Sequence, residues 1–139
     1  MRFPVRFANA MRPLGRIFGM PPDDCFVELD LEHGAFRVKA GIWFDETFSL
    51  GRVEDVAPSS WPWWGGLGVK LGPRDSLGVV ASTEGVIAIR FKERERMHLI
   101  VVVRRQELRV SLEDPDGFMR AMREATARTN GRAASGAQR

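Results

Sequence analysis

The residue types that most often carry catalysis are scarce in this sequence. Its 139 residues include one cysteine, Cys25, and two histidines, His33 and His98. These three residues cannot complete the four-ligand Cys/His set of a structural zinc site. The carboxylates of Asp23 and Asp24 beside Cys25 would raise the pKa of its thiol, which makes Cys25 a poor nucleophile. We therefore expect Cys25 to be a structural thiol.

Two pairs of adjacent acids, Asp45–Glu46 and Glu54–Asp55, would suit acid–base chemistry if their carboxylates converged. Both pairs lie in segments predicted as strands, where neighbouring side chains point to opposite faces. The sequence also lacks the glycine-rich signatures that hold nucleotide phosphates. We therefore predict no enzymatic activity, no catalytic residue, no cofactor and no bound metal.

Three of the four tryptophans lie in the segment Trp-Pro-Trp-Trp-Gly-Gly, as Trp61, Trp63 and Trp64. Exposed indole rings would form a binding surface for a sugar ring, a proline-rich peptide or a membrane interface. Buried rings would form a corner of the core, with the glycines allowing close backbone approach. The sequence leaves both interpretations open.

The net charge of +3 conceals an uneven distribution. Residues 1–20 carry four arginines and no acid, and residues 120–139 carry five arginines and one glutamate, so the remaining chain is acidic. The basic ends could contact nucleic acid or an anionic membrane, or they could lie against the acidic body. The candidate anion contacts at the N-terminal end are Arg2, Arg6, Arg12 and Arg16.

Apolar and polar residues alternate with a period of two along much of the chain, which predicts half-buried strands. Residues 27–31 and 36–39 flank a turn and predict an antiparallel hairpin. Further strands are expected at residues 42–50, 53–56, 67–71, 77–81, 86–92 and 108–112. The charged run 92–96 predicts an exposed hairpin end, and the apolar run 99–103 predicts a strand covered on both faces.

One helix is predicted at the C-terminal end of the domain. Asp114 suits the N-cap, Pro115 suits the first helical position, and the apolar residues Phe118 and Met122 recur at helical spacing. We expect this helix to cover an open end of the sheets and residues 129–139 to form a disordered tail. Residues 1–22 are basic and too apolar for a free tail, and they are expected to dock on the domain formed by residues 23–128.

The order of these elements resembles the bacterial pleckstrin-homology-like (PH-like) family over about residues 24–128. The resemblance rests on the motifs Trp-Pro-Trp-Trp-Gly-Gly-Leu-Gly-Val-Lys-Leu, Gly-Val-Ile-Ala-Ile-Arg-Phe and Val-Ser-Leu-Glu-Asp-Pro-Asp-Gly-Phe. It implies a mainly β fold, a partly open antiparallel barrel of two orthogonal sheets capped by one C-terminal α-helix. It also implies a binding role, for which Arg37 and Lys39 match in kind the basic residues around the family's first hairpin.

The sequence thus favours a non-enzymatic module that binds another protein or associates with itself, through a sheet edge or an aromatic surface. The alternative is peripheral attachment to an anionic membrane or to nucleic acid through the basic termini. We expect a cytoplasmic protein, because its single cysteine suits a reducing compartment and its longest apolar run is far shorter than the roughly 20 residues that span a bilayer. No small-molecule substrate is indicated.

Overall fold

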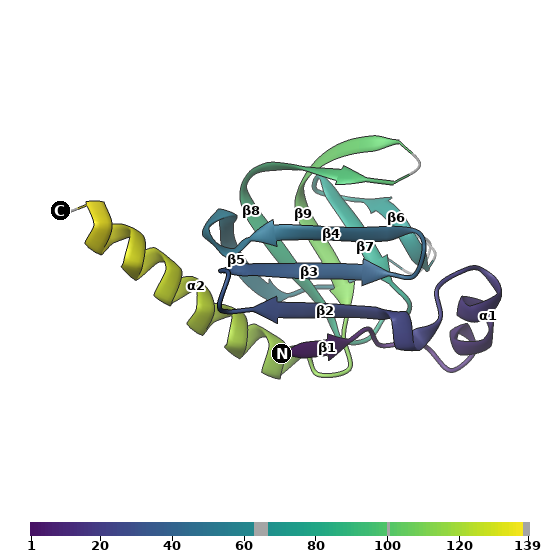
Figure 1. Ribbon diagram of the computed structural model, residues 1–139. Helices are drawn as coiled ribbons and strands as arrows, with labels where there is room; N and C mark the ends of the chain where they lie inside the picture. Colours follow the sequence, from purple (N-terminus) through teal and green to yellow (C-terminus); the bar gives the residue numbers. More distant parts are fainter. Residues whose placement is uncertain (63–66, 100, 138–139) are drawn as a thin grey trace.

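The computed structural model describes residues 1–62, 67–99 and 101–137, with side chains through residue 131. It shows a mainly β fold of two sheets and one C-terminal helix, as predicted (Figure 1). Among the described helices, none is both long and apolar enough to cross a membrane.

The first sheet is a four-stranded antiparallel meander. Its strands, in spatial order, are β1 (Arg2–Pro4), β2 (Cys25–Asp30), β3 (Ala35–Ala40) and β4 (Phe44–Ser49). The β2–β3 hairpin confirms the prediction. Val27 pairs with Val38 and both side chains are buried, whereas the next pair along the hairpin, Glu28 with Arg37, is only partly buried. The predicted third strand begins two residues too early, since Ile42 lies in the β3–β4 turn and is exposed.

The second sheet has five strands and one pairing that the sequence does not predict. Its strands are β5 (Val53–Pro58), β6 (Gly68–Gly72), β7 (Ser76–Val80), β8 (Val86–His98) and β9 (Val102–Ser111), in the spatial order β5-β8-β9-β7-β6. Because β9 inserts between β7 and β8, it runs antiparallel to β8 but parallel to β7. The prediction of an entirely antiparallel arrangement is therefore wrong for the β7–β9 pair.

The two sheets pack face to face with their strands crossing, and they do not close into a barrel (Figure 1). Phe36 and Phe48 of the first sheet meet Phe91 of the second, with ring centroids of the two pairs 6.2 and 5.0 Å apart. The backbone contacts that link the sheets outside the named strands are isolated bridges, Val5 with Leu112 and Phe7 with Ala81. The structure therefore confirms the coarser part of the prediction, a mainly β fold of two packed sheets with one C-terminal helix.

The charged run 92–96 is part of a long strand and not a hairpin end. After a bulge between Arg90 and Glu95, β8 continues to His98, and Glu95 is buried while Arg52 lies 3.2 Å from its carboxylate. The hairpin turns instead within the apolar run 99–103, because β8 ends at His98 and β9 begins at Val102. We expected this run to be a covered strand, but Val101 and Val102 are exposed, so the prediction is wrong for these two residues. Ile100 lies outside the described residues. Period-two alternation continues through residues 94–98, and charged side chains on both faces conceal it in the sequence.

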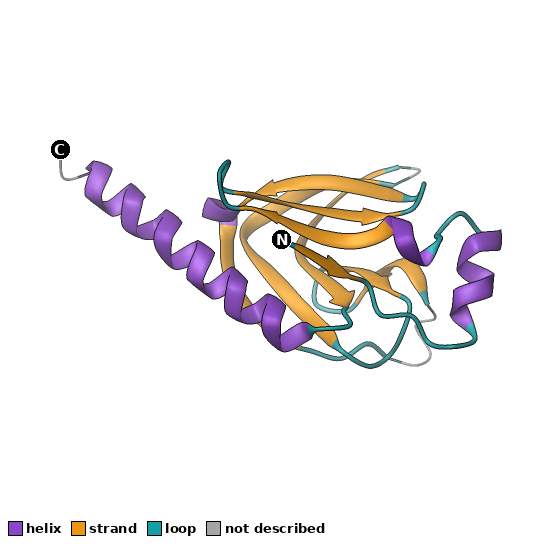
Figure 2. Ribbon diagram, turned by 60° about the horizontal axis from the view of Figure 1, so that its bottom comes forward, coloured by secondary structure: helices purple, strands orange, loops and turns teal. Residues whose placement is uncertain are grey.

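Helix α2 (Pro115–Ala137) begins where it is predicted and ends later. The Asp114 carboxylate accepts a hydrogen bond from the backbone N–H of Gly117 at 3.1 Å, which satisfies a free donor of the first turn. Phe118 and Met122 are buried, and the helix lies along the open side of the sheets, with its second half extending beyond them (Figure 2). Residues 129–137 of the predicted disordered tail are helical instead, because alanine and arginine extend an existing helix readily. Residues 138–139 of that tail lie outside the described residues.

The N-terminal segment is built into both layers. Strand β1 pairs with β2. The rings of Phe3 and of Phe118 in α2 pack in a T-shaped arrangement, with their centroids 5.2 Å apart. The short helices α1 (Met11–Ile17) and η1 (Pro22–Asp24) then lead into β2, while η2 (Leu50–Arg52) later joins β4 to β5. Figure 1 shows α1 at the end of the molecule opposite the tip of α2.

Candidate functional site

The structure places Trp61 in the core and not on a binding surface. Trp61 is only 4% exposed and packs with Val80 and Val86 in a small second core. A Cβ atom added at Gly78 would lie 2.5 Å from the Trp61 ring, so the glycine leaves room for the indole. This supports the core interpretation for Trp61. The other two candidates, Trp63 and Trp64, lie outside the described residues.

The two basic candidates of the first hairpin, Arg37 and Lys39, both lie against carboxylates. The Arg37 guanidinium donates two hydrogen bonds of 2.7 Å to Asp45, and Lys39 donates to Asp24 at 2.7 and 2.8 Å. The hydrogen bonds from Arg37 lower the pKa of Asp45, and the same bonds raise the pKa of Arg37. Their charges are thus balanced within the domain.

Three of the four N-terminal candidates also make ion pairs within the domain. The pairs are Arg2 with Glu28 at 3.4 Å, Arg6 with Glu84 at 3.4 Å and Arg12 with Glu113 at 3.3 Å. Arg16 is exposed and has no ion pair among the described residues. This arrangement matches the alternative in which the basic N-terminal end lies against the acidic body. Because such surface pairs contribute at most about 1 kcal/mol each, they position the segment only weakly.

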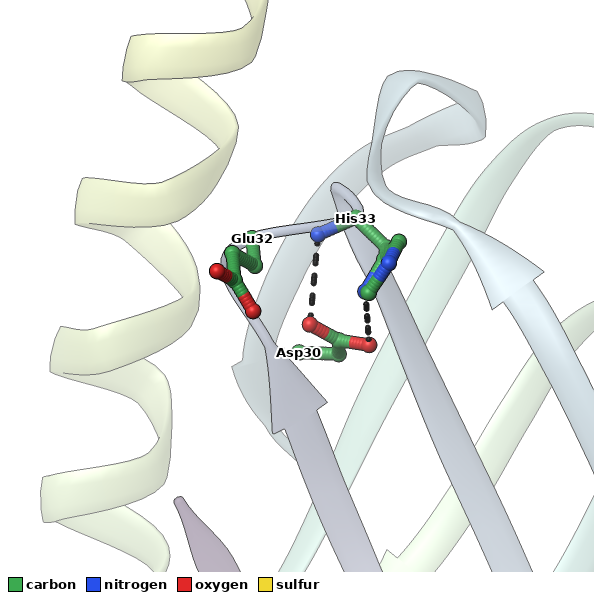
Figure 3. Close-up of side chains that lie close together, drawn as sticks. All are labelled: Asp30, Glu32 and His33. Atoms are coloured by element: carbon green, nitrogen blue, oxygen red, sulfur yellow. Dashed lines mark hydrogen bonds and ion pairs between the residues drawn. The ribbon is translucent and has the colours of Figure 1, made fainter.

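His33 belongs to a turn in which its backbone and its ring both contact Asp30, with Glu32 beside them (Figure 3). One Asp30 carboxylate oxygen accepts from the backbone N–H of His33 at 3.2 Å, and the other lies 2.7 Å from the ring Nδ1. The backbone hydrogen bond is the main cause of the lowered pKa of Asp30. Although the ligand atoms of Asp30, Glu32 and His33 lie within 4.8 Å of one another, all three residues are exposed and the turn itself explains their proximity. We assign no metal site to them.

Cys25 is buried at the start of β2. Burial is the main cause that raises the pKa of its thiol from 9.0 to about 12, so the thiol stays protonated near neutral pH. We expect Ellman's reagent to react with the native protein only as fast as the protein unfolds, and to react completely in guanidinium chloride. Rapid release of the coloured thiolate from the native protein would show that Cys25 is accessible and contradict this assignment.

A groove with a volume of about 360 Å³ lies between helix α1, the β3–β4 turn and the start of β6. We call it the α1–β6 groove. Its lining is mostly apolar and includes Leu14, Phe18, Trp43, Val69 and Lys70. Sequence reasoning missed this site, because Trp43 lies apart from the tryptophan cluster and the groove joins segments that are distant in sequence.

Two hydrogen bonds hold the segment after α1 and the β3–β4 turn together at one end of this groove. The Trp43 indole donates a hydrogen bond of 2.5 Å to the Phe18 carbonyl, and Ile42 N–H donates to the Gly19 carbonyl at 3.0 Å. Gly19 and Gly41 both adopt positive φ, at 82° and 53°, a region that glycine enters without a steric penalty. Phe18, which directly follows α1, is therefore held in the wall of the groove beside Trp43.

The groove lies beside an unpaired sheet edge. Within the described residues β6 has one neighbour in its sheet, β7, whereas each of the other three edge strands contacts a helix or hairpin outside its own sheet. Helix α2 contacts β1 through Phe118, and its Arg123 donates to the Val56 carbonyl of β5 at 3.0 Å. The β8–β9 hairpin reaches β4, where His98 N–H donates to Glu46 at 2.9 Å. Within the part of the chain that the structure describes, no strand pairs with the outer side of β6, so its backbone N–H and C=O groups offer an edge for an added strand.

Comparisons with protein-family models, with curated proteins and with solved structures give no match to this chain.

Proposed function

We propose that this chain is a non-enzymatic binding module that takes up an extended segment of a partner protein beside β6. The observation that carries the proposal is the unpaired β6 edge next to the apolar α1–β6 groove. In strand addition, main-chain hydrogen bonds give affinity, and a pocket for an alternate side chain gives specificity. The β6 edge would supply the main-chain hydrogen bonds, and the α1–β6 groove would supply the side-chain pocket.

The charges around the groove favour a partner segment that carries acids. Among the described lining residues, Lys70 is the only charged one. Arg16 on α1, which has no ion pair among the described residues, adds positive charge, and residues 1–20 contain no acid. An extended segment with one apolar anchor and flanking aspartates or glutamates would therefore complement this surface in shape and in charge.

We also propose that the domain is of the PH-like type and that it works in the cytoplasm. Support for the first comes from a four-stranded antiparallel sheet crossed by a second sheet, with a helix at the C-terminal end. The parallel β7–β9 pair departs from the expected pattern. Attachment to a membrane or nucleic acid through the N-terminal arginines has less support, because three of them make ion pairs within the domain.

The test is selection from a displayed library of random peptides, followed by nuclear magnetic resonance on the full chain. We expect enriched peptides to combine one apolar anchor with acids, to shift the Trp43 indole N–H resonance and to slow amide exchange in β6. Leu14→Asp should weaken the selected peptide about tenfold or more, a loss of about 1.4 kcal/mol. Ile17→Asp is the matched control, because Ile17 lies on the same helix, is 74% exposed and does not line the groove.

Equal effects of Leu14→Asp and Ile17→Asp, or a selected peptide that leaves β6 exchange unchanged, would contradict the proposal. Light scattering during size-exclusion chromatography should show a monomer. A dimer that Leu14→Asp dissociates would identify a second copy as the occupant and overturn the assignment to a different partner protein.

A further inference from the structure

The β8–β9 hairpin ends in apolar side chains that face solvent. Val101 is 65% exposed and Val102 is 55% exposed, whereas the neighbouring Leu99 is half-buried and packs against the main core. We call Val101 and Val102 the hairpin tip. The tip does not contribute to the core, and exposed apolar groups that gather at one end of a projecting element favour a nonpolar environment outside the domain.

Two arginines lie directly opposite each other behind the tip. Arg96 on β8 is the cross-strand partner of Arg104 on β9, and both side chains are exposed. They share the outer face of the hairpin, because Glu95 and Met97, which flank Arg96 on β8, are buried on the inner face. We call Arg96 and Arg104 the arginine pair.

The domain itself does not neutralise the arginine pair. The nearby Arg94 and Arg105 both reach Asp75, at 2.8 and 3.2 Å, whereas neither member of the pair has an ion pair among the described residues. Residues 96–106 contain no acid. Like charges directly opposite on adjacent strands destabilise a sheet. The pair therefore has no stabilising role inside the domain and suits an external anion.

We propose that this hairpin binds the surface of an anionic lipid bilayer, with the tip inserted at the boundary between headgroups and acyl chains and the arginine pair on lipid phosphates. The apolar tip favours lipid over nucleic acid, because valine side chains gain from leaving water at a bilayer interface. Guanidinium groups form bidentate hydrogen bonds with phosphate, and two of them side by side concentrate positive charge at one place. This surface is separate from the α1–β6 groove and from the N-terminal arginines.

The first experiment measures co-sedimentation of the full chain with two kinds of vesicle across a range of salt concentrations. One kind contains phosphatidylcholine alone, and the other contains phosphatidylcholine mixed with phosphatidylglycerol. We expect binding to the anionic vesicles only, and binding that weakens as salt rises. The double variant Arg96→Gln, Arg104→Gln should reduce the partition coefficient about 30-fold, given the contribution of each basic residue near an anionic surface.

The control variant is Arg16→Gln, Arg120→Gln, which removes the same net charge from exposed residues that have no ion pair within the described chain. We expect it to retain most of the binding. Thermal unfolding distinguishes loss of the surface from loss of the fold, because removing the arginine pair relieves a repulsion and should leave the melting temperature unchanged or higher.

The second experiment detects insertion of the tip. Val101→Cys is labelled with an environment-sensitive fluorophore, and the buried thiol of Cys25 should stay unlabelled in the native protein. Anionic vesicles should shift the emission at position 101 to the blue. Leu71→Cys, on the exposed β6 strand, should show no shift.

The proposal is overturned if anionic vesicles do not bind the chain at low salt, or if both double variants lose binding equally. A blue shift at position 71 without one at position 101 would place the membrane contact elsewhere and also overturn it. Salt-dependent binding to duplex DNA, without binding to vesicles, would assign the arginine pair to nucleic acid instead.

Discussion

Replacing Phe91 with alanine should lower the free energy of unfolding by about 3 to 5 kcal/mol, the largest effect expected from a single core substitution here. The Phe91 ring is fully buried and packs against the rings of both Phe36 and Phe48, stacked on the first at an interplanar angle of 7°. These contacts join the second sheet to the first. Truncation would leave a cavity where the two layers meet.

Urea unfolding followed by tryptophan fluorescence measures this loss. Phe18→Ala is the matched control, because the Phe18 side chain is largely exposed and its truncation should cost less than about 1 kcal/mol. If Phe91→Ala cost no more than Phe18→Ala, the packing of the two sheets through these rings would be wrong.

The second large effect is expected from Gly41→Ala, which should destabilise the protein by about 3 kcal/mol. Gly41 has a φ of 53°, and an added Cβ would clash with the carbonyl oxygen of Gly19. Relief of that clash requires a backbone shift where α1 approaches the β3–β4 turn. The substitution should therefore also disturb the α1–β6 groove and shift the Trp43 indole resonance.

Gly34→Ala separates the cost of the backbone conformation from the cost of the clash. Gly34 also has a positive φ, 61°, but a Cβ there meets no atom within 4 Å. It should lose only about 1 kcal/mol, the penalty for an L-residue in the left-handed region. Equal losses in thermal or urea unfolding for the two variants would show that Gly19 and Gly41 are not in close contact.

Features determined by neighbouring residues could be predicted from the sequence. The start of α2 depends on Asp114 and Pro115, which act within one turn of the helix. The β2–β3 hairpin depends on a turn and on alternation in the two adjacent segments. In both cases the residues that decide the structure lie within a few positions of one another.

Features determined by distant residues could not be predicted. The insertion of β9 between β7 and β8 has no local signal, because strand alternation specifies a face and not a neighbour. The run 99–103 is apolar enough for a core strand. The hairpin nevertheless turns within it, because β8 continues through the charged segment 92–96 and ends only at His98. The α1–β6 groove likewise requires knowing that Phe18 meets Trp43 and that both lie near Val69.

The double pairing of the N-terminal segment has a consequence for how the protein is made. Val5 bridges to Leu112, and Arg6 N–H donates to the Ser111 carbonyl at 2.9 Å, so Val5 and Arg6 find partners that are synthesised more than a hundred positions later. On the ribosome, the apolar side chains of this segment stay without their final cover until the last strand has left the exit tunnel. The closing step of folding must therefore follow translation of nearly the whole domain, and premature chain termination would leave the apolar side chains of this segment exposed to solvent.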